Sequence, residues 1–312
     1  MAKVLFTGTG YENRHFASIE QAGHQWCFLE DSLNYKALSV LVTDVHGYVL
    51  GGDEFVDTSL LDLASQLRAI SFVGVGYQNF IDAEAAKVRG ISLLNTPGAT
   101  SNAVAEATIG LIIAARRRLF WLNDLGKAGH SGDLRSADLT NATVGIIGLG
   151  SIGQAVASFL RLAFNMRVIY WSRSRKQDAE VTFGLEFITL DKLAFEADIV
   201  VTCMASEPET VGIINVDFLS NCRNGVIIVN PASHKLIDHN AMCESLISEK
   251  VSCFAQDDVP SVSDVPAVVD LQKMGNDRVI LLPHATAKTP GSWNKTLDQA
   301  VENILKALSG VA

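Results

Sequence analysis

The sequence feature that most constrains the fold is a glycine-rich turn between an apolar strand and an apolar helix. In the segment TVGIIGLGSIGQA, Gly148, Gly150 and Gly153 form a G-x-G-x-x-G pattern. The first glycine permits a tight turn, the second lets the backbone approach a pyrophosphate, and the third allows close packing of helix on strand. The pattern predicts a dinucleotide site in which helix-start residues Ser151 and Ile152 take part. The alternative is a glycine-rich connection without a ligand.

The residues after the next apolar strand indicate which dinucleotide would fit. The strand VIYW is followed by Ser172, Arg173, Ser174 and Arg175, and no acidic residue stands at this strand end. A carboxylate there would accept hydrogen bonds from free ribose hydroxyls, whereas an arginine binds a 2′-phosphate through strong, directional hydrogen bonds. The segment therefore predicts NADP(H) rather than NAD(H). A solvated basic loop is the alternative interpretation.

Short apolar segments alternate with helical patterns in two series, separated by a long helical stretch predicted over about 101–126. This alternation is typical of βαβ units and predicts parallel sheets in an α/β fold. A final helix is predicted over about 293–308. The strands predicted in the first series cover residues 4–6, 40–42, 70–73 and 91–94.

Charge and cysteine content exclude several classes of protein. The chain has 25 Lys and Arg against 34 Asp and Glu, and its net charge of −9 disfavours nucleic acid and anionic membranes as partners. Its five cysteines form no C-x-x-C pair, which predicts a reduced, cytoplasmic protein. No apolar run approaches the roughly 20 residues of a membrane span. Because scattered histidines such as His15 and His130 lack ligand spacing, no metal is expected, and the expected partner is a small molecule.

Further motifs occur along the chain in a fixed order. They are GVGYQN from Gly74, NTPG from Asn95, VAE from Val104, the glycine turn, PET from Pro208, Asp257 and the Pro283–His284 pair. In these motifs the chain resembles the D-isomer-specific 2-hydroxyacid dehydrogenase family. Its Ser-Arg-Ser segment is similar to that of the NADPH-preferring glyoxylate/hydroxypyruvate reductases.

The resemblance implies two doubly wound parallel-sheet domains with the active site in the cleft between them. A flavodoxin-like substrate domain would comprise residues 1–100 and 290–312, and a Rossmann cofactor domain would comprise residues 101–289. The resemblance also implies a homodimer formed through the cofactor domain.

The resemblance implies roles for individual residues as well. His284 would be the acid/base, Asp257 would contact the nicotinamide carboxamide, and Thr108 would lie near the nicotinamide. The residues implied at the substrate carboxylate are Val75, Gly76 and Tyr77.

The catalytic positions depart from the family pattern. Where the family has Asn-x-x-Arg-Gly, Ser233 occupies the arginine position and His234 the glycine position. The glutamate expected five residues after Asp257 is absent, which leaves Asp264 as the expected nearby carboxylate. Ser233 can donate one neutral hydrogen bond but cannot supply the arginine's charge to a developing oxyanion. Ordinary 2-keto acid reduction should therefore be impaired.

Three interpretations follow from these departures. The chain is an NADPH-dependent oxidoreductase whose small carbonyl or imine substrate needs less help from a cation. Alternatively, another cation such as His234, Lys235 or Lys288 takes the arginine's place, and the chain reduces ordinary 2-keto acids such as glyoxylate and hydroxypyruvate. In the third interpretation catalysis is lost, and the protein binds NADP(H) as a sensor or scaffold.

Overall fold

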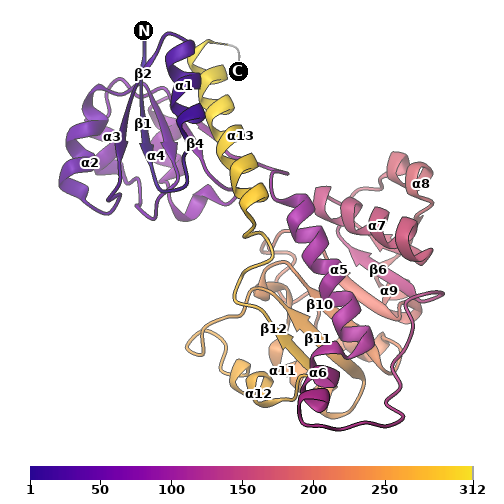
Figure 1. Cartoon of the computed structure of the whole chain (residues 1–312). Helices are drawn as coiled ribbons and strands as arrows, with labels where there is room; N and C mark the ends of the chain where they lie inside the picture. The colour runs from indigo at the N-terminus through magenta and orange to yellow at the C-terminus, as the bar shows by residue number, and fades with distance from the viewer. Residues whose placement is uncertain (311–312) are drawn as a thin grey trace. The chain divides into compact units, whose positions relative to one another are not determined.

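The computed structural model describes residues 1–310, which form two compact units (Figure 1). The first comprises Met1–Thr100 together with the segment that begins at Thr289, and the second comprises Ser101–Lys288. Each unit has a parallel β-sheet with helices on both faces. The predicted α/β class with two parallel-sheet domains is confirmed.

The first unit has a five-stranded parallel sheet in the order β2-β1-β3-β4-β5. Its strands are β1 (Lys3–Thr7), β2 (Gln25–Leu29), β3 (Gly47–Leu50), β4 (Ala69–Phe72) and β5 (Ser92–Leu94). One face packs against α1 (Asn13–Gln21) and α13 (Pro290–Leu308). The other face packs against α2 (Tyr35–Leu41), α3 (Thr58–Leu63) and α4 (Ala83–Val88). The short 3₁₀ turns η1 (Val42–Asp44) and η2 (Tyr77–Asn79) complete the unit.

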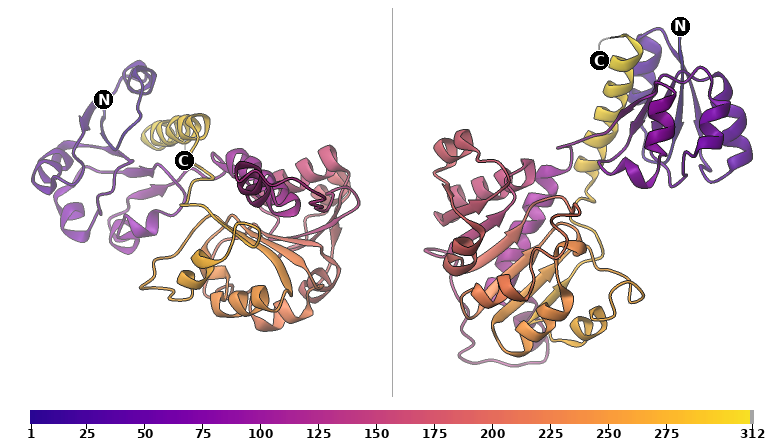
Figure 2. Two further views of the ribbon diagram at one scale, coloured as in Figure 1. Left: turned by 60° about the horizontal axis from the view of Figure 1, so that its bottom comes forward. Right: turned by 180° about the vertical axis from the view of Figure 1, so that it is seen from behind.

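The final helix α13 belongs to the first unit because its apolar face covers that sheet (Figure 2). Leu297, Val301 and Ile304 recur at helical spacing and are all buried. Thr289 caps the helix by accepting a hydrogen bond from the Ser292 amide at 3.1 Å.

The strand predicted over 40–42 is wrong, because these residues end α2 and begin η1. Leu38 and Val42 lie four residues apart and are buried, while Val40 is exposed, which is the spacing of a helix. Asn34 starts that helix by accepting the Ala37 amide. The strand in this part of the chain is β3 instead. Edge strand β2 was not predicted from the sequence, and its side chains are half exposed.

The second unit has a seven-stranded parallel sheet in the order β12-β11-β10-β9-β6-β7-β8. The strand order reverses at β6, which pairs with β7 on one side and β9 on the other. In open α/β sheets ligands bind beside the carboxyl ends of the strands at such a reversal. The strands are β6 (Thr143–Ile147), β7 (Arg167–Trp171), β8 (Glu186–Phe187), β9 (Ile199–Thr202), β10 (Val226–Asn230), β11 (Val251–Gln256) and β12 (Val279–Leu281).

Helices cover both faces of this second sheet. One face carries α5 (Ser101–Arg117), α7 (Ser151–Phe164) and α8 (Gln177–Phe183). The other face carries α9 (Leu190–Glu196), α10 (Val216–Asn221), α11 (His239–Ile247) and α12 (Val268–Lys273), with the short turn η3 (His234–Leu236) after β10.

The single helix predicted over about 101–126 is two helices, α5 and α6 (Leu119–Lys127). The break lies at Arg118, whose φ of 54° is left-handed and cannot continue a right-handed helix. Arg118 is held there by Asp277 at 3.1 Å and by the Trp121 ring beneath its guanidinium. Among residues 1–310, no helix is long and apolar enough to cross a membrane.

Candidate functional site

The glycine turn after β6 is built as its sequence predicts. Gly148 has a φ of 96°, and a Cβ placed on it would lie 2.5 Å from the Cys203 carbonyl oxygen. A Cβ on Gly153 would lie 2.3 Å from the carbonyl oxygen of Gly148. Neither position accepts a side chain without movement of the backbone, so both glycines are needed for the turn to reach the start of α7.

Gly150 differs from the other two glycines, because a Cβ there would meet no atom within 4 Å. The protein's own packing therefore does not require a glycine at this point. Gly150 is the N-cap of the 14-residue helix α7 and gives it no side-chain cap. The amides of the first turn, which includes Ser151 and Ile152, remain available to an anion. An open approach to bare helix-start amides fits the pyrophosphate of a dinucleotide.

A cavity of about 250 Å³ lies beside this turn. Its wall includes Gly148 and Gly150 from the turn and Ser172, Arg173 and Ser174 from the segment after β7. Some of the residues predicted at the pyrophosphate and at the 2′-phosphate thus line one space, whereas Ser151, Ile152 and Gly153 do not line it. The binding roles of all these residues stay predictions.

Arg175 does not line this cavity. Its guanidinium pairs with Glu180 at 2.7 Å. The hydrogen bond from Arg175, together with one from the Tyr170 hydroxyl, lowers the pKa of Glu180 to about 2. A role for Arg175 at the cofactor stays a prediction.

The cavity is also lined by a carboxylate that was not predicted from the sequence. Glu207 follows β9 and pairs with Arg173, with Nη1 2.5 Å from Oε2 and Nη2 3.3 Å from Oε1. Its amide donates to the Thr210 hydroxyl at 2.8 Å, which fixes the loop. The cavity wall therefore carries two cations that attract a 2′-phosphate, Arg173 and Lys176, and one carboxylate that repels it.

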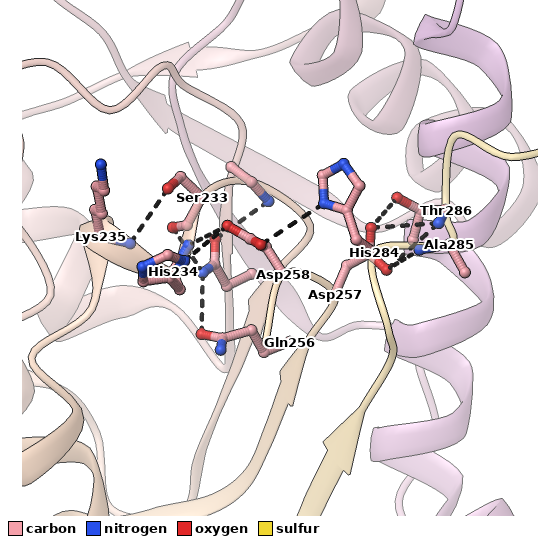
Figure 3. A network of polar contacts seen from close by, with 11 residues as sticks. Ser233, His234, Lys235, Gln256, Asp257, Asp258, His284, Ala285 and Thr286 are labelled. Atoms are coloured by element: carbon pink, nitrogen blue, oxygen red, sulfur yellow. Dashed lines mark hydrogen bonds and ion pairs between the residues drawn. The ribbon is translucent and has the colours of Figure 1, made fainter. Parts of the chain in front are cut away.

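A second cluster of polar residues gathers where β10, β11 and β12 end (Figure 3). Asp257 is buried and accepts hydrogen bonds from the Ala285 amide at 2.7 Å and from the amide and hydroxyl of Thr286. Its backbone oxygen accepts the His284 amide at 2.8 Å. These bonds hold His284 at a φ of 52°, a left-handed conformation that a residue other than glycine keeps only when its surroundings impose it.

Asp258 lies between two histidines. Its Oδ2 accepts the His234 amide at 3.1 Å and lies 2.9 Å from Nδ1 of the same residue, and its Oδ1 is 3.7 Å from Nδ1 of His284. Burial disfavours its charged form, but the hydrogen bonds from His234 outweigh this and lower the pKa of Asp258. The expectation that Asp264 is the nearby carboxylate is wrong, because Asp264 is exposed and contacts Ser261 and Ser263. The carboxylate beside His284 is Asp258.

Two other predicted site residues already have local partners. The Ser233 hydroxyl accepts the Lys235 amide at 3.3 Å and caps η3. Thr108 is buried, and its hydroxyl donates to the Val104 carbonyl oxygen at 2.6 Å. Their roles in catalysis and at the nicotinamide stay predictions.

In the first unit, the predicted substrate-binding residues form the turn after β4. The Asn95 amide group donates to the Val75 carbonyl at 2.9 Å, and Tyr77 begins η2. Within residues 1–310, no partner occurs for the backbone amides of Val75 and Gly76. Two adjacent free amides can bind a carboxylate, so this role stays a prediction with geometry that suits it.

No group of three or more His, Cys, Asp or Glu in the described part of the chain is placed to hold a metal ion.

Comparison with known proteins places the chain in a family. Residues 109–286 match the family model described as D-isomer specific 2-hydroxyacid dehydrogenase, NAD binding domain. The glyoxylate/hydroxypyruvate reductase B of Enterobacter sp. (strain 638) is 32% identical over 267 residues, which cover 84% of this chain and 81% of that protein.

Solved structures share the whole fold. The TT0316 protein of Thermus thermophilus is 29% identical with a TM-score of 0.81, over 99% of this chain and 97% of that one. An acyclic imino acid reductase solved with NADPH and D-Arg has a TM-score of 0.82 at 21% identity, over 99% and 97% of the two chains. The chain belongs to the D-isomer-specific 2-hydroxyacid dehydrogenase family and is an oxidoreductase of small carbonyl substrates with a nicotinamide dinucleotide cofactor.

Proposed function

We propose that the chain is an NADPH-dependent reductase of a small carbonyl or imine substrate and an atypical member of its family. The observation that carries the cofactor choice is the cavity of about 250 Å³ that Arg173 lines together with Gly150. A pyrophosphate at the helix start would bring the adenosine ribose toward this end of the sheet. Arg173 would then bind the 2′-phosphate through charge-assisted hydrogen bonds.

His284 is the proposed proton donor. The bound reduced nicotinamide supplies a hydride to the substrate carbon. The imidazole of His284 gives a proton to the carbonyl oxygen as it gains negative charge. The side chain of His284 is 69% exposed, so a substrate can reach it. The free amides of Val75 and Gly76 would bind a substrate carboxylate.

The substrate class follows from what stands in the arginine position. Ser233 caps η3 with its hydroxyl and brings no positive charge. A protonated imine carries its own charge and needs less stabilisation from the protein than a neutral ketone does. The fold is shared with an acyclic imino acid reductase, so imines belong among the substrates to be tested. Ordinary 2-keto acid reduction is the second candidate, since the Enterobacter relative is a glyoxylate/hydroxypyruvate reductase.

The test uses the purified chain with NADPH and NADH against 2-keto acids, aldehydes and imines. Cofactor binding is followed by fluorescence and turnover by absorbance. We expect NADPH-preferring turnover that His284→Gln removes while NADPH affinity is retained. Binding without turnover on every compound would favour the sensor interpretation, and a preference for NADH would contradict the role of Arg173.

A further inference from the structure

We propose that Asp258 is a positioning residue for the proton donor His284, and that His234 fixes the orientation of Asp258. The inference rests on the proposed function, because it concerns the acid of that same reaction. It assigns roles to two residues outside the glycine turn and the ribose segment.

The contact of Asp258 with His234 is fixed, whereas its contact with His284 can adjust. Oδ2 of Asp258 faces both the backbone amide and the ring Nδ1 of His234, so the plane of the carboxylate is set from two directions. Its other oxygen, Oδ1, therefore points toward Nδ1 of His284 at 3.7 Å. That separation exceeds a hydrogen bond of 2.7–3.2 Å, but His284 is an exposed side chain on a loop and can close it by rotating.

The side chains of the two histidines differ in how freely they can rotate. The side chain of His234 is 20% exposed and that of His284 is 69% exposed. His234 is held by its ring and its backbone, so it can anchor Asp258 while His284 turns toward a substrate. When Nδ1 of His284 donates to Asp258, Nε2 becomes the ring nitrogen that faces outward. A carboxylate that fixes which nitrogen reacts is a common aid to histidine catalysis.

Two other titratable groups near this pair, Asp257 and His239, already have partners. The carboxylate of Asp257 accepts hydrogen bonds from the loop after His284 and cannot turn to the ring. His239 is buried and bonds to Gln256, and burial lowers the pKa of His239. Asp258 is thus the carboxylate that the described residues offer to His284.

The proposed step conserves atoms and charge. The substrate carbon gains a hydride from the reduced nicotinamide, and the carbonyl oxygen gains the proton from Nε2 of His284. For a carbonyl substrate, the C=O double bond would become a C–OH single bond, with the two electrons supplied by the bound reduced cofactor. His284 then regains a proton from solvent. Asp258 transfers no proton and acts only through its negative charge and its hydrogen bond.

The first experiment compares Asp258→Asn with Asp264→Asn in the full-length protein. Asp264→Asn removes a charge from the same loop region without touching His284. We expect Asp258→Asn to lower kcat about tenfold or more, with KM and NADPH affinity little changed. Asp258→Glu should restore part of kcat.

The outcomes separate this inference from the proposed function. If the wild type turns over and Asp258→Asn matches it, the inference is wrong and the proposed function stands. If the wild type does not turn over on any substrate, the proposed function fails. The inference is then judged by histidine ¹⁵N NMR, with signals assigned through His234→Gln and His284→Gln. A His284 Nδ1 signal that moves in Asp258→Asn but not in Asp264→Asn supports it, and an unmoved signal overturns it.

Discussion

Replacing Glu207 by glutamine should strengthen NADPH binding and leave NADH binding slightly weaker. The change keeps the size of the side chain and removes the negative charge that now pairs with Arg173 at 2.5 Å. It frees the guanidinium for a 2′-phosphate and removes a charge that would repel that phosphate. For NADH the same change removes an acceptor for a ribose hydroxyl.

The size of the expected gain in NADPH affinity follows from the exposure of the two side chains and from the distance between Glu207 and the phosphate. The side chains of Arg173 and Glu207 are 70% and 39% exposed, so their pair contributes about 0.2–1 kcal/mol, which the phosphate must overcome. Two unit charges about 4 Å apart in water interact by about 1 kcal/mol, and a phosphate carries about 1.5–2 charges. The total is about 1.7–3 kcal/mol. Since about 1.4 kcal/mol is a tenfold change, NADPH should bind roughly 15- to 140-fold more tightly at low salt.

The assay is a fluorescence titration of both cofactors at two salt concentrations. Glu209→Gln is the matched control, because Glu209 is an exposed carboxylate two residues further along the same loop. The gain from Glu207→Gln should shrink at high salt, because ions screen exposed charges. In an Arg173→Ala background most of the gain should disappear. If Glu207→Gln changes NADPH affinity no more than Glu209→Gln does, the account of the cavity is refuted.

Three further variants test other parts of the site and fold. Gly150→Ala should unfold in urea like the wild type but bind dinucleotide more weakly. Gly153→Ala should lose about 1–3 kcal/mol of unfolding free energy, because its Cβ would meet backbone. Equal unfolding of the two variants would contradict this prediction. Asp257→Asn should cost about 1–3 kcal/mol of unfolding free energy, because the buried loop amides lose a charged acceptor. The pKa of Glu180 falls from 4.5 to about 2, so the stability it gains from Arg175 is present above pH 4.5 and is lost as pH falls toward 2. Glu180→Gln should flatten the pH dependence of unfolding in that window, and an unchanged profile would speak against the pair.

The glycine turn could be predicted because the spacing of its glycines is a local pattern. A Cβ on Gly153 would meet Gly148 within the turn, and a Cβ on Gly148 would meet Cys203, which follows the adjacent strand β9. The strand prediction for residues 40–42 failed because a short apolar run fits a strand or a buried helix end equally well. Only the tertiary burial of Leu38 and Val42 separates the two.

Asp258 and Glu207 could not be found in the same way. Asp258 meets His234 across 24 residues of chain, and Glu207 meets Arg173 across 34. Both contacts depend on the strand order of the second sheet, in which β10 and β11 are neighbours and β7 and β9 lie on either side of β6. A carboxylate in a loop has no local pattern that marks its partner. A search for charged residues directly after each predicted strand would have selected Asp258 but not its role.

The position of α13 has a consequence for how the protein is made. The part of this sheet face that α1 does not cover stays exposed until α13 is made, and about 190 residues separate Thr100 from Thr289. At about 5–20 residues per second, a ribosome needs about 10–40 s to bridge that interval. The second unit can fold while the nascent first sheet still lacks its cover. Chaperones that bind nascent chains should therefore contact the amino-terminal strands for longer than any other part of this polypeptide.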